Sequence, residues 1–147
     1  MVNYLPKHST QRYQDRPTGN IKFVIVHHSA DEGDPWGWAR YHVDHHGWPG
    51  IGYHAAVMRD GTVLKTNLDR TLSYHAGGAY NPISVGICFQ GDLSKRPPTI
   101  EQLAAGLVTV NRYVRAYNAQ IKGHGEVMQT ACPGAAWLVD WLRRAII

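Results

Sequence analysis

Two short, uninterrupted runs of apolar residues constrain the fold of this chain more than any other feature of its sequence. Residues 23–26 are Phe-Val-Ile-Val, and residues 84–89 are Ser-Val-Gly-Ile-Cys-Phe. Runs of this length without polar alternation are typical of strands that helices bury on both faces. Segments with helical periodicity are also present. The sequence therefore predicts an α/β fold: a single domain with a central mixed β-sheet flanked by helices.

Cap signals and apolar periodicity predict the helices. An Asp-Pro pair opens the first, over residues 34–46, and a Gly-Trp-Pro-Gly segment ends it. Thr99, with Gln102 three residues later, has the capping-box pattern for a helix through about Asn118. A last helix is expected from Pro133. Apolar residues at helical spacing should face the core in the last two helices: Leu103, Leu107, Val110, Val114, Trp137, Leu138, Trp141, Leu142 and Ala145.

A hairpin and a long loop complete the expected order of elements. Residues 51–58 and 63–65 flank an Asp-Gly pair, which is typical of a tight turn between two strands. The segment between Asn118 and the last helix is expected as a loop. Residues 1–20, which are polar and contain Pro and Gly, are expected as an extended arm laid over a domain of residues 21–147.

Composition narrows the classes of function. No apolar run approaches the roughly 18 residues of a membrane span, and the N-terminus has no apolar segment typical of a secretory signal. The formal net charge of +4 favours an anionic partner such as nucleic acid, a membrane surface or a cell-wall polymer. Because no basic run carries interleaved aromatic residues, no nucleic-acid partner is expected. We expect a monomer.

Histidine and cysteine residues suggest a metal site. His124 and Cys132 stand eight residues apart in an irregular segment, and His27 follows the first apolar run directly. Zinc accepts imidazole nitrogen at roughly 2.0–2.1 Å and thiolate sulfur at roughly 2.3 Å. Each residue alone is more often a packed or solvent-facing side chain than a ligand. A disulfide between Cys88 and Cys132 is possible in principle, although a chain of this length does not need one.

Four separated motifs between about Phe23 and Pro133 resemble one known family. They are Val-His-His-Ser-Ala, Gly-Tyr-His, Tyr-His-Ala-Gly-Gly-Ala-Tyr-Asn, and Gly-His-Gly-Glu followed by Ala-Cys-Pro-Gly. In this order they resemble the zinc-dependent N-acetylmuramoyl-L-alanine amidases, a family that includes phage lysozyme-type amidases and the animal peptidoglycan recognition proteins. The resemblance implies the amidase fold for residues 21–147.

The resemblance also implies roles for individual residues. In some related amidases the strand that corresponds to residues 84–89 carries a carboxylate near the metal. Here it offers Cys88 and then Gln90, so no side chain is assigned as general base. Glu126 is interpreted as an anchor of its own loop. The implied roles are His27, His124 and Cys132 as ligands of one Zn²⁺ per chain, Tyr53 and Thr130 as catalytic residues, and His75 and Asn81 as substrate-binding residues.

The resemblance implies a zinc hydrolase that cleaves the amide between N-acetylmuramic acid and L-alanine in peptidoglycan. Its implied partner is the glycan strand with its stem peptide. We expect a bacteriolytic phage or prophage endolysin, made in the host cytoplasm and acting at the bacterial cell wall. The alternative is a non-catalytic peptidoglycan-binding module, but such relatives typically lack the cysteine that stands here at Cys132. A structural zinc module is disfavoured because no fourth Cys or His ligand is evident.

Overall fold

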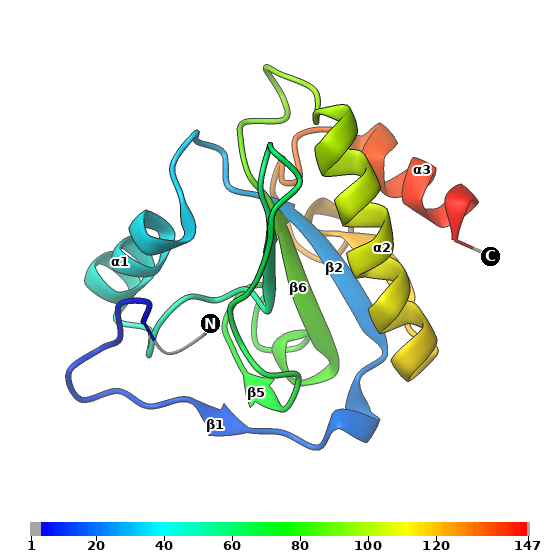
Figure 1. Ribbon diagram of the computed structural model, residues 1–147. Helices are drawn as coiled ribbons and strands as arrows, with labels where there is room; N and C mark the ends of the chain where they lie inside the picture. The colour runs from blue at the N-terminus through cyan, green and yellow to red at the C-terminus, as the bar shows by residue number, and fades with distance from the viewer. Residues whose placement is uncertain (1–3, 147) are drawn as a thin grey trace.

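A five-stranded sheet forms the centre of the computed structural model, which describes residues 4–146 (Figure 1). Its strands stand in the order β4-β3-β6-β2-β7. A separate pair of two-residue strands joins β1, which is part of the N-terminal arm, to β5. The strand bounds are β1 (Gln14–Asp15), β2 (Phe23–His28), β3 (Ala55–Val57), β4 (Val63–Lys65), β5 (Thr71–Leu72), β6 (Ser84–Phe89) and β7 (Gln120–Gly123).

The sheet is mixed, as the sequence predicts. β2 lies between β6 and β7 and pairs with both in parallel, and β3 pairs in parallel with β6. Within the described five-stranded sheet, only the β3–β4 pair is antiparallel, because the Asp-Gly turn returns the chain directly from β3. The separate β1–β5 pair is also antiparallel. The expected strand over residues 51–58 is shorter, since only Ala55–Val57 pairs with neighbouring strands.

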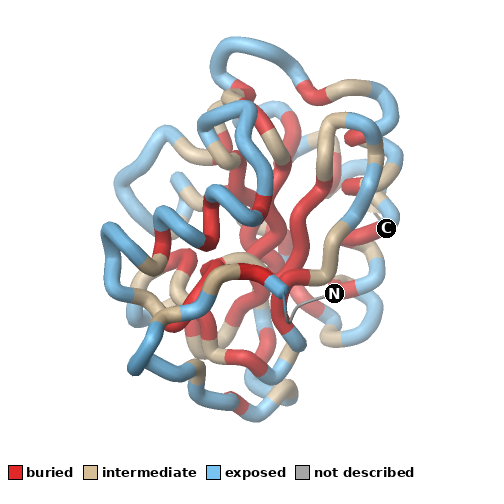
Figure 2. Tube along the Cα trace, turned by 60° about the vertical axis from the view of Figure 1, so that its left-hand side comes forward, coloured by how far each residue is buried: buried red, intermediate tan, exposed pale blue. Residues whose placement is uncertain are grey.

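Helices cover both faces of the sheet. α1 (Pro35–His46) lies on one side, whereas α2 (Ile100–Tyr117) and α3 (Ala136–Ala145) lie on the other (Figure 1). The single-turn helices η1 (Thr18–Asn20), η2 (Asn81–Ile83) and η3 (His124–Glu126) connect the larger elements. Buried residues concentrate along the central strands (Figure 2). The prediction of a central mixed sheet flanked by helices is confirmed, and no helix of residues 4–146 is long and apolar enough to span a membrane.

The two faces of the sheet have different chemistry. On the side of α2 and α3, one apolar cluster contains Val24 and Val26 of β2 together with Ile87 and Phe89 of β6. Because side chains alternate along a strand, the intervening residues face α1. Cys88 accordingly packs in a second, smaller cluster with residues of α1. The same alternation turns the side chains of Ile25 and His27 toward the α1 side.

Local capping confirms two helix starts and corrects a third. Asp34 accepts a hydrogen bond from the Gly37 N–H at 3.0 Å, and Thr99 Oγ1 accepts one from the Gln102 N–H at 3.0 Å. The Gln102 side chain does not reach back to Thr99, because its amide donates to the carbonyl oxygens of Val57 and Gln90 instead. α3 begins at Ala136 rather than at Pro133.

The late start of α3 has a backbone cause. Gly134 has φ of +78°, in the left-handed region, and its N–H closes a turn to the carbonyl of Ala131. A residue in that conformation cannot be part of a right-handed helix. The segment around Pro133 is therefore a turn that precedes the helix.

β7 is an element that the sequence prediction missed. The segment Gln120–Gly123 contains a single large apolar residue, Ile121, which gives no strand pattern. It is a strand because β2 offers a free edge, to which the backbone of β7 pairs from Phe23↔Gln120 to Val26↔Gly123. Strand formation here depends on a non-local partner and not on local propensity.

A buried arginine adds to the β1–β5 pairing in joining the N-terminal arm to the body. The Arg16 guanidinium donates to the carbonyl oxygens of Asp69, Asn81, Pro82 and Ser84 at 2.8–3.1 Å. These bonds satisfy a charged group that is only 5% exposed. Residues 1–3 of the predicted arm lie outside the described residues, and the division at residue 20 stays a prediction.

Gly106→Ala should destabilise the protein although it improves helix propensity. A Cβ at Gly106, inside α2, would lie 2.4 Å from two ring atoms of the fully buried Phe89. Overpacking of this kind typically costs about 1–3 kcal/mol, more than the roughly 1 kcal/mol that Ala gains over Gly in a helix. Urea unfolding should therefore give a lower free energy of unfolding. Val108→Ala, at an exposed site of the same helix, should change it by only a few tenths of a kcal/mol. An increase for Gly106→Ala would contradict this packing.

Acid should weaken the fold through His54. This fully buried ring accepts from the Gly86 N–H at 3.1 Å and donates to the Thr71 carbonyl at 3.0 Å, so it is held neutral. Burial lowers the pKa of His54 from 6.5 to about 3. The unfolded chain binds a proton at His54 that the folded state excludes. The free energy of unfolding should therefore fall as the pH drops from 6.5 to about 3. The loss of unfolding free energy that His54 causes is up to about 1.4 kcal/mol per pH unit.

The measurement is urea unfolding at pH 7, 5 and 4. His54→Gln should be less stable at pH 7 but should lose less stability on acidification than the wild type. His45→Gln, at an exposed position of α1, is the matched control and should keep the wild-type pH dependence. Parallel pH profiles for wild type and His54→Gln would show that His54 does not carry this effect.

Candidate active site

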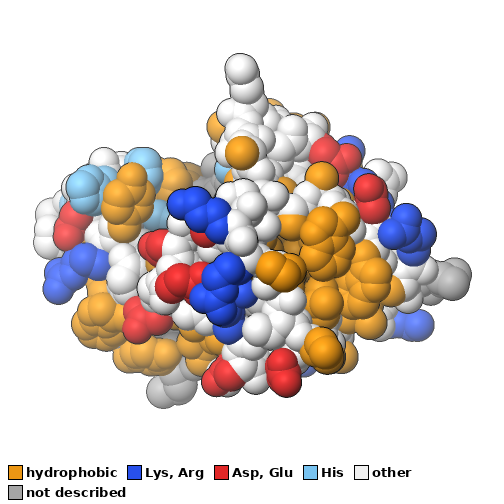
Figure 3. Space-filling model, turned by 90° about the horizontal axis from the view of Figure 1, so that it is seen from above, with side chains coloured by type: hydrophobic (Ala, Val, Ile, Leu, Met, Phe, Trp, Pro, Cys, Tyr) orange, Lys and Arg blue, Asp and Glu red, His pale blue; other side chains and the backbone are white. Residues whose placement is uncertain are grey.

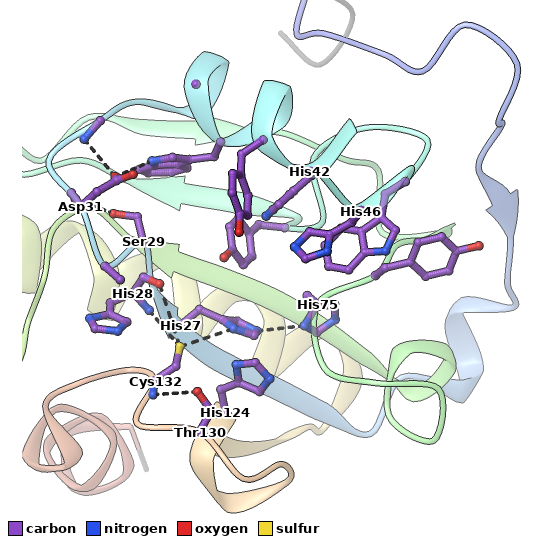
Figure 4. A pocket seen from close by; sticks show the side chains of 18 of the residues that line it. His27, His28, Ser29, Asp31, His42, His46, His75, His124, Thr130 and Cys132 are labelled. Atoms are coloured by element: carbon purple, nitrogen blue, oxygen red, sulfur yellow. Dashed lines mark hydrogen bonds between the residues drawn. The ribbon is translucent and has the colours of Figure 1, made fainter. Parts of the chain in front are cut away.

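Three segments bring His27, His124 and Cys132 together. His27 stands near the end of β2, His124 opens η3, and Cys132 lies in the turn before α3. Their ligand atoms all lie within 4.8 Å of one another, and His27 Nδ1 is 3.7 Å from Cys132 Sγ. Atoms at such separations can all contact one ion at the roughly 2.0–2.3 Å typical of zinc, so the donor set fits a zinc site. Figure 4 shows the three side chains converging.

Strand register explains why two of the ligands meet. The last pair between β2 and β7 is Val26↔Gly123, so the next residues on the two parallel strands, His27 and His124, are neighbours. Their ring centroids are 4.5 Å apart. A strand that the sequence prediction missed therefore places the second ligand.

The cysteine loop is tied down by backbone hydrogen bonds. The Gly125 N–H donates to the Cys132 carbonyl at 2.8 Å, and the His28 N–H donates to Cys132 Sγ at 3.4 Å. Glu126 accepts from the Gly123 N–H at 2.7 Å and from Arg143 at 2.6 Å. The interpretation of Glu126 as a loop anchor is confirmed.

Burial sets the protonation of the ligands. Burial, and then the neighbouring His75, lower the pKa of His27 well below 6.5, and burial also lowers the pKa of His124. Both imidazoles are thus neutral near pH 7, as metal ligands must be. Burial raises the pKa of the Cys132 thiol to about 12, opposed by the hydrogen bond from the His28 N–H. A thiolate in this position needs a cation beside it.

Tyr53 and Thr130 stand beside the triad. The Tyr53 ring lies 5.1 Å from the His27 ring, centroid to centroid. Burial, and then the sulfur atoms of Cys88 and Cys132, raise the pKa of Tyr53 well above 10, so its hydroxyl keeps its proton. Thr130 Oγ1 accepts from the Cys132 N–H at 3.2 Å, which leaves its own hydrogen to donate.

A cavity of about 720 Å³ opens above the triad. Its far wall is aromatic and comes mainly from α1 and the segment after it: Trp38, Tyr41, His42, His46, Trp48 and Tyr74. In Figure 3, histidine side chains gather beside hydrophobic ones over α1. Among the described lining residues Asp31 is the sole carboxylate, and there is no lysine or arginine. The cavity is therefore suited to a largely uncharged, ring-containing ligand.

Six of the seven predicted site residues line this cavity: His27, Tyr53, His75, His124, Thr130 and Cys132. Asn81 does not. It is buried at the start of η2, where its Oδ1 accepts from the N–H groups of His75 and Ala76 at 3.0 and 2.8 Å. Substrate contact by Asn81 and His75 stays a prediction. The sequence prediction assigned no role to Ser84 or to the aromatic wall, because their positions depend on packing.

Known proteins with similar sequences and structures agree with this geometry. A family model described as N-acetylmuramoyl-L-alanine amidase matches residues 17–135. This chain belongs to that family. The predicted enzyme class and the resemblance are thereby confirmed, with the His/His/Cys triad in place. The match ends close to the start of α3, so the family model covers the sheet, the cavity and the ligand loop.

Relatives and solved structures extend the likeness. Peptidoglycan recognition protein 1 of Bos taurus is 34% identical over 127 residues, which cover 78% of this chain and 67% of that protein. The amidase LysC from Clostridium intestinale has a similar structure, with a TM-score of 0.81 and 26% identity over 95% of this chain and 97% of that one. The structure of the Ph2119 endolysin, from a Thermus scotoductus bacteriophage, has a TM-score of 0.78 and 31% identity over 91% of each chain.

Cys132→Ser should abolish tight zinc binding and leave the fold intact. A serine hydroxyl stays protonated near neutral pH and is a poor zinc ligand. The loop should still close, because the bonds from the Gly125 N–H to the Cys132 carbonyl and from the Gly134 N–H to the Ala131 carbonyl need no sulfur. Metal analysis should find about one zinc per wild-type chain and far less in the variant. Chelation should lower the wild-type melting temperature, because the metal binds only the native state. Cys88→Ser is the matched control and should retain zinc. Equal zinc content in both variants would exclude Cys132 as a ligand.

Proposed function

We propose that this protein is a zinc hydrolase of peptidoglycan that cleaves the amide between the lactyl group of N-acetylmuramic acid and L-alanine of the stem peptide. The observation that carries the proposal is the His27, His124 and Cys132 triad at the base of an open cavity in an amidase-family chain. Three protein ligands without a fourth are typical of catalytic zinc sites, whereas structural sites are closed by four.

The chain's own residues would act around the reacting carbonyl. A zinc ion at the triad would polarise that carbonyl and lower the pKa of water. As water adds to the carbonyl carbon, the carbonyl oxygen gains negative charge and needs a hydrogen-bond donor. Tyr53 can serve, because its hydroxyl stays protonated and it stands next to His27. Thr130 can donate from the opposite segment of the cavity wall, beside Cys132.

The aromatic wall suits the sugar end of the substrate. Trp48 stacks on His46 with centroids 4.4 Å apart, and Tyr41 stacks on His45 at 4.5 Å. Flat ring surfaces of this kind bind sugar rings by apolar contact. The net charge of +4 would add a general attraction to anionic wall polymers from outside the cavity, because the described residues that line the cavity include no lysine or arginine.

The proposed setting is that of a monomeric endolysin, made in the host cytoplasm and released onto the bacterial wall. Similarity to LysC and to the Ph2119 endolysin along nearly the whole chain supports this setting. The recognition-protein relatives favour the alternative of a binding module, but a complete ligand triad favours hydrolysis.

The test of function is product analysis. Purified cell wall incubated with the protein should release stem peptides with new L-alanine amino termini, identified by mass, and chelation should stop the release. Binding to wall fragments without any such product would establish the binding module instead. Release of fragments cut elsewhere in the stem or in the glycan would assign a different hydrolase.

Tyr53→Phe should slow hydrolysis and retain zinc. Loss of one oxyanion donor typically lowers turnover on the order of 10²–10³-fold. Zinc content and melting temperature should change little, because the ring that packs against His27 remains. The rate is measured as release of amino termini, with Tyr117→Phe on α2 as a control remote from the cavity. An unaltered rate for Tyr53→Phe would show that the Tyr53 hydroxyl takes no part in hydrolysis and that the ring only packs against its neighbours.

A further inference from the structure

A line of buried hydrogen bonds runs from the metal ligand His27 into the body of the protein. His27 Nε2 lies 2.9 Å from His75 Nδ1, and His75 Nε2 lies 3.2 Å from Ser84 Oγ. Ser84 Oγ in turn lies 2.7 Å from the Tyr80 carbonyl oxygen. His27, His75 and Ser84 are at most 6% exposed, so water competes little for these bonds. Figure 4 shows His27 between His75 and Cys132.

The Tyr80 carbonyl oxygen, the last acceptor of the series, fixes which group donates in each hydrogen bond. The Tyr80 carbonyl can only accept, so the single hydroxyl hydrogen of Ser84 is donated to it. Ser84 Oγ must then accept from His75 Nε2–H. A neutral imidazole has one N–H, which makes His75 Nδ1 an acceptor for His27 Nε2–H. His75 is neutral because it is buried and both its ring nitrogens contact neutral side chains.

We propose that His75 is a positioning residue for the metal centre: it holds His27 in the tautomer with a hydrogen on Nε2 and directs the Nδ1 lone pair at the zinc position. The free Nδ1 is the ring atom that faces Cys132 Sγ, at 3.7 Å. Both ring nitrogens of His75 contact protein groups, so His75 acts through His27 and not through contact with the substrate. It deepens the proposed function and rests on zinc binding at the triad.

Neighbouring residues fix the position of the His75 ring. Gly86 of β6 lies directly beneath it, and a Cβ at that position would be 2.6 Å from His75 Nδ1. Asn81 Oδ1 holds the backbone of His75 by accepting from the N–H groups of His75 and Ala76. A strand glycine here makes room for the ring, since any side chain would push His75 away from His27.

The identity of the acceptor has a chemical consequence. Metal-bound histidines commonly donate their second N–H to a carboxylate, which adds negative charge. A neutral imidazole orients His27 without adding charge, so a Zn²⁺ with one thiolate would keep a net charge of +1. A site of that charge activates a carbonyl more strongly than a neutral one.

The first test measures zinc affinity by competition with a chromophoric chelator. His75→Ala should weaken binding by roughly 10- to 100-fold, the usual effect of losing such a partner. His75→Asn places an amide oxygen near the position of Nδ1 and should restore most of the affinity. Gly86→Ala keeps both histidines, displaces the His75 ring and should weaken binding in the same way. Trp48→Phe alters the cavity wall without touching His27 and should leave zinc affinity unchanged.

The second test needs neither zinc nor substrate. Nitrogen-15 NMR of the metal-free wild type should show His27 and His75 each with hydrogen on Nε2, and Ser84→Ala should release His75 into a mixture of tautomers. His27 protonated on Nδ1, or equal zinc affinity in wild type, His75→Ala and Gly86→Ala, would overturn the proposal. Failure of the wild type to bind zinc would instead overturn the proposed function, which separates the two outcomes.

Discussion

The parallel pairing of β2 with its two neighbours is the constraint on which the rest of the structure depends. The pleat sends Val24 and Val26 into the apolar core beneath α2, and it sends His27 to the opposite face. The same strand thus contributes to the core and carries a metal ligand. A slip of one residue in this register would turn His27 into the apolar core and Val26 into the cavity.

The polar groups on the α1 side of the sheet are buried only because each has a partner. His54 bonds to Gly86 and Thr71, Arg16 bonds to four carbonyl groups, and His75 bonds to Ser84. Unpartnered groups of this kind would cost several kcal/mol each. Most of these partners lie on other segments of the chain, so a rigid site and a complete fold require each other. Rigidity of this kind holds the three ligand side chains near one point.

The cavity brings two kinds of chemical group together in one site. Its base presents nitrogen, sulfur and hydroxyl groups for amide chemistry, and its α1 wall presents aromatic rings. The positive charge of the protein lies elsewhere on the surface, since no lysine or arginine is among the described residues that line the cavity. The net positive charge and the chemical groups that line the cavity are therefore separate features of the molecule.

The sequence by itself determined whatever depends on neighbours along the chain. Caps such as Asp34 and Thr99, the apolar runs of β2 and β6, and the candidate ligands in their motifs could all be predicted, because side-chain type and spacing decide them. Only the tertiary structure decided that Gln120–Gly123 is a strand, that Asn81 turns away from the cavity, and that His75 bonds to His27. Those features depend on partners that folding brings together, such as the free edge of β2 and the bare Gly86. Side-chain type and spacing along the chain do not show which partner the fold supplies, so no periodicity or cap could have predicted them.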